Sequence, residues 1–144
     1  DGKFGYYTNN AFTSHSHAWS SGPTSALTEF VLGLRVTGLV GISWQFAPQL
    51  SELNKAVGGF TTKLGKFQAS WLNNVDGYAA NVSTPAVTQG ELILPVLVKG
   101  DMPRVLLDGK AVCPPWYRGT DTVIVQTVGG NHTLEVSSGT TSCS

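Results

Sequence analysis

The hydrophobic residues near the start of the chain follow no period until about residue 21 and then recur at helical spacing. Residues 1–16 are typical of a loop, and Ser21-Gly22-Pro23 marks a helix start, because proline loses no hydrogen bond in the first turn. An apolar stripe follows, made of Ala26, Leu27, Phe30, Val31 and Leu34. Gly33 and Gly38 bracket its expected end. A helix this short is marginal alone in water, so its stripe must pack on something else.

From about residue 40 the pattern alternates between apolar and polar positions, which is typical of half-buried strands. Ser51 to Val57 is the exception, where we expect a short helical turn. Asp108-Gly109 is the clearest hairpin signal, because a type I′ turn needs positive φ at both central residues. The expected strands are Gly41–Ala47, Phe60–Lys63, Lys66–Trp71, Tyr78–Val82, Glu91–Val98, Arg104–Leu107, Thr122–Val128 and His132–Ser137.

Short strands divided by glycine- and asparagine-rich turns predict a mainly β protein with an antiparallel β-sandwich. We therefore divide the chain into residues 1–38, a loop plus a helix that belongs to another body, and residues 39–144, a complete sandwich domain.

The composition narrows the class of protein. The chain has 144 residues, 41% of them hydrophobic, which suits one domain with a real core. Nine basic residues balance nine acidic ones, so no basic patch argues for nucleic acid or for a membrane surface. No apolar run approaches the roughly 20 residues of a membrane-spanning helix. Asp1 opens the chain without a basic start, so we expect any signal peptide to lie outside it.

Cysteines and sequons favour a secreted protein. The two cysteines, Cys113 and Cys143, lack metal-ligand spacing, which leaves a disulfide or two free thiols open. Asn81-Val82-Ser83 and Asn131-His132-Thr133 are acceptor triplets for N-glycosylation. Together with the scarcity of lysine, they indicate an extracellular location.

Residues 17–24, HAWSSGPT, and residues 27–34, LTEFVLGL, resemble a segment of glycoside hydrolase family 78, the α-L-rhamnosidases, especially the fungal members. In that family a similar run opens the last helix of an (α/α)₆ catalytic barrel. The runs WQFAP at 44–48, TKLGKFQASW at 62–71 and GGNHT at 129–133 suit the C-terminal β-sandwich that follows. The resemblance implies an enzyme that releases terminal α-L-rhamnose from glycosides by an inverting route.

Inverting hydrolysis needs an acid and a base about 6.5–9.5 Å apart. In the family these acids lie upstream of the HAWSSGPT motif, so this chain should not be catalytic alone. Either the mature enzyme is cut in a barrel loop and this chain stays docked to a larger partner, or the chain is a fragment. The unburied stripe favours the first interpretation, as does the glycine- and asparagine-rich start, where nicking commonly occurs. No cofactor is implied.

Two residues of the first segment, His17 and Trp19, are candidates for the substrate site. Zinc sites usually have four ligands, and His17 has only His15 nearby, which argues against a metal. By the resemblance, His17 is the histidine that hydrogen-bonds a rhamnose hydroxyl; the alternative is a loop histidine that bonds to backbone. His15 has no family match and is expected in solvent. Trp19 could stack on a sugar, although packing between barrel and helix is the more usual role.

The remaining candidates have mostly structural interpretations. We expect Glu29 to be solvated or salt-bridged, and Ser20 and Ser21 to cap the helix, not to act as nucleophiles. Trp44 and Trp71 lie in alternating strands and are expected in the core, whereas Trp116 is a candidate for an accessory sugar contact. Two further functions therefore stay open: an independent carbohydrate-binding module, and a structural interaction domain.

Overall fold

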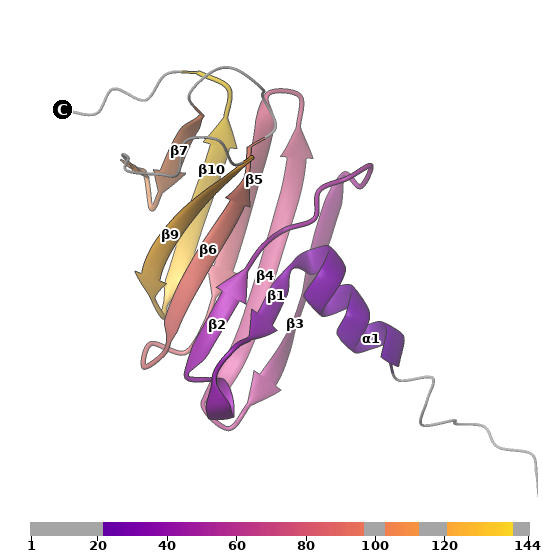
Figure 1. The fold of residues 1–144 in the computed structure, drawn as a ribbon, viewed down its shortest axis with the longest axis vertical. Helices are drawn as coiled ribbons and strands as arrows, with labels where there is room; N and C mark the ends of the chain where they lie inside the picture. The colour runs from indigo at the N-terminus through magenta and orange to yellow at the C-terminus, as the bar shows by residue number, and fades with distance from the viewer. Residues whose placement is uncertain (1–21, 97–102, 113–120, 140–144) are drawn as a thin grey trace, which may run out of the picture.

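The computed structural model describes residues 22–96, 103–112 and 121–139 (Figure 1). The described part of the chain begins with a short helix, α1 (Gly22–Leu27), which continues as a π-helical turn, η4 (Thr28–Leu32). A 3₁₀ turn, η5 (Leu39–Gly41), lies between the first two strands. The strands are β1 (Leu34–Val36), β2 (Ser43–Phe46), β3 (Lys55–Thr62), β4 (Gly65–Asn74), β5 (Gly77–Ser83), β6 (Gln89–Pro95), β7 (Arg104–Leu107), β8 (Lys110–Ala111), β9 (Thr122–Val128) and β10 (Asn131–Ser137).

The strands form two sheets, so the predicted mainly β fold is confirmed for the described residues. One sheet has four strands in the order β1-β2-β6-β9, and the other has six in the order β3-β4-β5-β10-β7-β8. Their inward side chains form one apolar core, as expected for a β-sandwich. The predicted core positions Trp44 and Trp71 are 1% and 2% exposed.

One strand pair departs from the expected antiparallel arrangement. β2 and β6 pair in parallel, with Ser43 opposite Gln89 and Phe46 opposite Leu92. Between them the chain crosses to the other sheet and builds β3, β4 and β5 there. Parallel neighbours need such a long crossover connection, and here three strands of the opposite sheet supply it in place of a helix.

Two local predictions are wrong. Leu34 was expected at the end of the helical stripe, but it begins β1 and is 1% exposed. Ser51 to Val57 was expected to be a helical turn, whereas β3 already begins at Lys55. The residues of β3 alternate in exposure, and Ala56 faces Trp71 across the ladder with β4, so strand pairing overrides the local pattern.

The Asp108-Gly109 hairpin is confirmed. Both residues have positive φ, 52° and 75°, and the turn joins β7 to β8 with Leu107 opposite Lys110. This is the geometry that a type I′ turn requires.

A buried hydrogen bond fixes the centre of the core. The indole nitrogen of Trp44 donates to Thr88 Oγ1 at 2.9 Å, and the Thr88 hydroxyl donates to the carbonyl of Pro85 at 2.6 Å. The indole ring lies directly over Gly90, where an added Cβ would be 2.1 Å from Trp44 Cζ2. Only glycine leaves room for the ring at this position.

Candidate functional site

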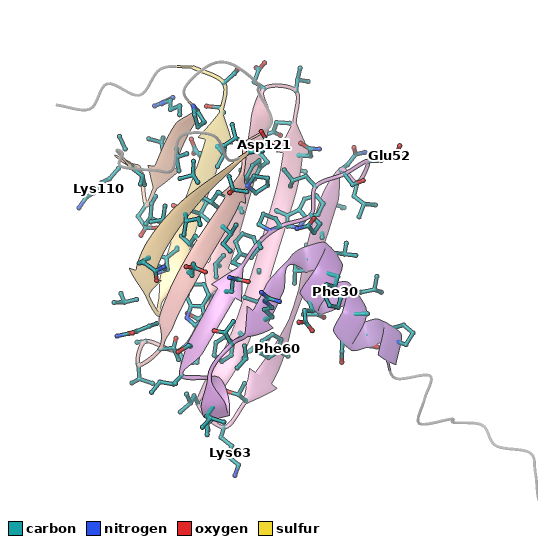
Figure 2. All side chains as sticks on the ribbon, in the orientation of Figure 1. Phe30, Glu52, Phe60, Lys63, Lys110 and Asp121 are labelled. Carbon is teal, nitrogen blue, oxygen red and sulfur yellow. The ribbon has the colours of Figure 1, made fainter. Side chains whose placement is uncertain are left out.

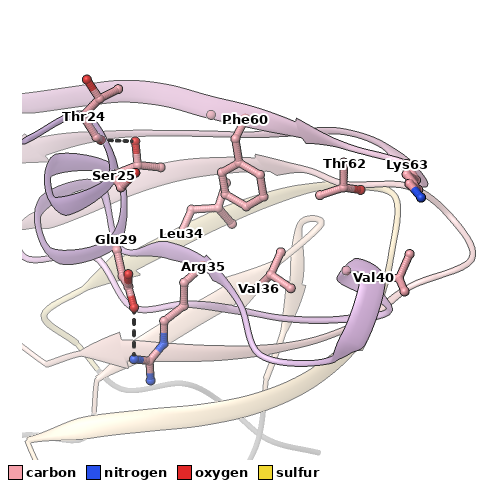
Figure 3. Close-up of a pocket in the computed structure, with 13 residues that line it drawn as sticks. Thr24, Ser25, Glu29, Leu34, Arg35, Val36, Val40, Phe60, Thr62 and Lys63 are labelled. Carbon is pink, nitrogen blue, oxygen red and sulfur yellow. Dashed lines mark hydrogen bonds and ion pairs between the residues drawn. The ribbon is translucent and has the colours of Figure 1, made fainter. Parts of the chain in front are cut away.

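A groove of about 660 Å³ separates the helical segment from the sandwich (Figure 3). One side is formed by Thr24, Ser25, Thr28 and Glu29 of the helical segment, and the other by β1, η5 and β3. Phe60 and Leu34 form its apolar floor (Figure 3). The Phe60 ring stacks on Phe67, with 5.2 Å between ring centroids.

Gly33 positions the helical segment against the sandwich. Its φ of +86° ends the π-helical turn, and its N–H donates to the Thr28 carbonyl at 3.1 Å. An added Cβ would be 2.1 Å from the Ala47 carbonyl oxygen, so the two chain segments approach as closely as glycine allows. Two backbone bonds complete the junction: Ala47 donates to Gly33 at 2.8 Å, and Gln49 donates to Val31 at 3.2 Å.

The apolar stripe of the helix is mostly uncovered in the described structure. Phe30 and Leu27 are 63% and 59% exposed, and no residue of α1 is buried. Only the last turn packs on the sandwich, through Leu32, which is 4% exposed and lies over Gly58. Figure 2 shows Phe30 on the helix beside the sheets. That a further body covers this stripe stays a prediction.

A second uncovered apolar group lies at the far end of the groove. Leu39 and Val40 of η5, and Ile42 directly after it, are 88%, 63% and 55% exposed. Val40 has φ 61°, an unfavourable conformation for a β-branched residue. Together with Leu27 and Phe30, these residues form what we call the apolar flank. Large exposed apolar side chains of this kind are found at protein–protein contacts.

Glu29 is ion-paired, as expected. Its Oε1 lies 3.7 Å from Arg35 Nη1 (Figure 3), with both side chains at least 40% exposed. Glu29 is also the only carboxylate among the described residues that line the groove. An acid–base pair for inverting hydrolysis needs two carboxyl groups, and the described residues of the groove supply one.

From Arg35 a row of polar side chains crosses the outer face of the four-stranded sheet. Arg35 Nε donates to Gln45 Oε1 at 2.8 Å, and Gln45 Nε2 donates to Glu91 Oε2 at 2.8 Å. Gln126 Nε2 donates to the other Glu91 oxygen at 2.7 Å. These residues are direct partners in the strand register, so one carboxylate ties the parallel pair β2–β6 to β9.

A histidine–carboxylate pair that the sequence did not indicate joins the β7–β8 turn to the start of β10. His132 Nδ1 lies 2.8 Å from Asp108 Oδ2, and His132 Nε2 lies 2.9 Å from the Val128 carbonyl. The Thr133 N–H donates to Asp108 Oδ1 at 2.8 Å. Burial acts to raise the pKa of Asp108, but the Thr133 and His132 hydrogen bonds and the charge of His132 outweigh it and lower the pKa.

The substrate-site candidates His17 and Trp19 lie outside the described residues, as do His15, Trp116 and both Cys113 and Cys143. Their roles stay predictions. The sequon residues Asn81 and Asn131 are described, and both are exposed on neighbouring strands of the six-stranded sheet.

Within the described ranges, no three His, Cys, Asp or Glu side chains gather where they could hold a metal ion. No helix there has the length and apolarity to cross a membrane.

The fold resembles parts of two solved enzymes. The chain matches the α-L-rhamnosidase from Dictyoglumus thermophilum with a TM-score of 0.78 and 16% sequence identity, over 92% of this chain and 15% of that chain. It matches the Streptomyces avermitilis α-L-rhamnosidase, solved with L-rhamnose, with a TM-score of 0.62 and 15% identity, over 76% of this chain and 10% of that chain. No protein-family model matches the sequence, and no curated protein matches it. At these identities the likeness is one of fold, shared with a small part of each rhamnosidase.

Proposed function

We propose that this chain is the C-terminal chain of a secreted α-L-rhamnosidase, an inverting glycosidase that releases terminal α-L-rhamnose. The observation that carries the proposal is the fold match, because 92% of this chain superimposes on 15% of a known rhamnosidase. The HAWSSGPT and LTEFVLGL runs point to the same family independently of the structure.

The exposed apolar flank supports the proposal that this chain binds a larger chain. In the proposed assembly α1 is the last helix of an (α/α)₆ barrel, and the rest of that barrel covers Leu27 and Phe30. The sandwich holds this helix in place through Gly33 and the buried Leu32. The chain then acts as a stabilising domain that delivers one barrel helix.

The chemistry is divided between the two chains in this proposal. The larger chain supplies the acid that protonates the leaving oxygen and the base that activates water. His17 contributes a hydrogen bond to a rhamnose hydroxyl, and Trp19 lies beside the sugar. Glu29, the one carboxylate among the described residues of the groove, is paired with Arg35, and we assign it no catalytic role.

Paired substitutions in the assembled enzyme test the role of His17. Loss of one sugar hydrogen bond costs about 1–2 kcal/mol, so His17→Ala should lower kcat/KM roughly 5- to 30-fold. His15→Ala is the matched control, two residues away, and should leave kcat/KM unchanged. Equal effects of both substitutions, or none from His17→Ala, would assign His17 to structure.

A further inference from the structure

The two sequons, 50 residues apart in the sequence, lie face to face in the fold. β5 and β10 pair in antiparallel register, with Asn81 opposite Thr133 and Ser83 opposite Asn131. Each asparagine thus faces the hydroxyl residue of the other sequon. The middle residues, Val82 and His132, are also opposite each other.

The asparagines share the outer face of the six-stranded sheet. Val82 between them is 1% exposed and points into the core, so residues 81 and 83 point outward. Asn81 and Asn131 are both exposed. Their positions are diagonal across one strand pair, which places their Cα atoms about 7–8 Å apart.

The two carboxamides differ in their hydrogen bonds. Ser83 Oγ donates to Asn131 Oδ1 at 2.6 Å, which fixes the Asn131 side chain against β5. Within the described part of the chain, no hydrogen bond engages the Asn81 side chain. Asn81 is therefore the freer of the two acceptors.

A hollow of about 350 Å³ lies on the same face, and both Asn81 and Asn131 line it. Ser70, the register partner of Asn81 on β4, lines it together with Gln68 and with Val57 of β3. Val57 is 78% exposed. An N-acetylglucosamine ring has an apolar face and polar edges, and this hollow offers an isopropyl group next to a hydroxyl and a carboxamide.

We propose that the two sequons form a single modification site, which carries one N-linked glycan per folded molecule, attached to Asn81. Two glycans leaving the sheet in parallel at this spacing would compete for the same volume, because both asparagines line the same hollow. Asn81 is the favoured acceptor because the Ser83 hydroxyl holds the Asn131 side chain against β5. The inference rests on the proposed secretion but does not depend on the rhamnosidase activity.

The experiment counts glycans on single molecules. The full chain is secreted from a yeast host, and N-glycans are trimmed enzymatically to one N-acetylglucosamine each before intact-mass measurement and peptide mapping. Chains retained in the cell are measured in the same way. The wild-type protein should carry one residual N-acetylglucosamine, at Asn81.

Two substitutions remove one sequon each and leave the other intact. Asn81→Gln should move the glycan to Asn131, because the competing sugar is gone. Thr133→Val removes the second sequon while keeping the hydrogen bond between Ser83 and Asn131, and it should leave the single glycan at Asn81 unchanged.

Other results contradict the proposal directly. Wild-type molecules carrying two glycans would show that the site is not shared. Molecules without a glycan, or with one at Asn131 and a bare Asn81, would overturn the choice of acceptor. The rhamnosidase proposal is independent of these outcomes, since it is judged by association with a larger chain and by activity.

Discussion

Phe30 offers the sharpest test of the apolar flank, because most of its side chain is uncovered in this chain. A phenylalanine side chain buries about 200 Å² when it is fully covered. With 63% of Phe30 exposed, docking of a partner can remove about 125 Å² from water. At about 25 cal/mol per Å² this burial is worth about 3 kcal/mol. Because 1.4 kcal/mol corresponds to a tenfold change, Phe30→Ala should weaken association with the larger chain about 100-fold.

The assay compares two properties of each variant: its affinity for the larger chain, by titration calorimetry, and its own thermal unfolding. Val128→Ala is the matched control, because Val128 is also 63% exposed but lies on β9, at the opposite edge of the four-stranded sheet from β1. We expect Phe30→Ala to lose affinity with little change in Tm, and Val128→Ala to change neither. Unchanged affinity of Phe30→Ala, or a loss of Tm that explains the weaker binding, would refute the reasoning.

Two further predictions concern the sandwich itself. Gly90→Ala should destabilise the chain by about 1–3 kcal/mol in a denaturant titration, because the added Cβ would clash with the Trp44 ring. Gly22→Ala is the control and should be near neutral, because no atom lies within 4 Å of its added Cβ. Equal effects of the two substitutions would contradict the packing argument. Asp108 has a pKa lowered by folding, so its contribution is present above the unfolded value of about 4 and is lost as the pH falls through the folded pKa. Because the Asp108 side chain is 45% exposed, that contribution should stay below about 1 kcal/mol. Asp108→Asn keeps a residue that tolerates positive φ and should flatten the acid limb of a Tm-against-pH profile; an unchanged limb would contradict this assignment.

Much of the sandwich could be predicted because residues close together in the sequence specify its strands and tight turns. Alternation located β7 and β9 at their observed bounds, and the residue pair Asp108-Gly109 specified its turn. The order of the strands within each sheet depends on contacts between residues far apart in the sequence. The parallel pairing of β2 with β6 depends on which sheet the intervening strands join, and no period in the sequence encodes that choice.

The same distinction applies to the candidate sites. The ion pair of Glu29 with Arg35 joins residues on adjacent elements, and a salt-bridged role was expected from the helix alone. Asp108 and His132 are 24 residues apart and meet only because β7 pairs with β10. The facing sequons depend likewise on the β5–β10 register. Contacts between residues far apart in the sequence could therefore be identified only from the fold.

Native mass spectrometry of the purified enzyme, combined with an assay on an aryl α-L-rhamnoside, tests the central claim most directly. We predict a complex of this chain with a larger chain, with activity that is lost when the two are separated and regained when they are mixed. A stable monomer of 144 residues that never associates, or a larger chain that is fully active without it, would contradict the proposal.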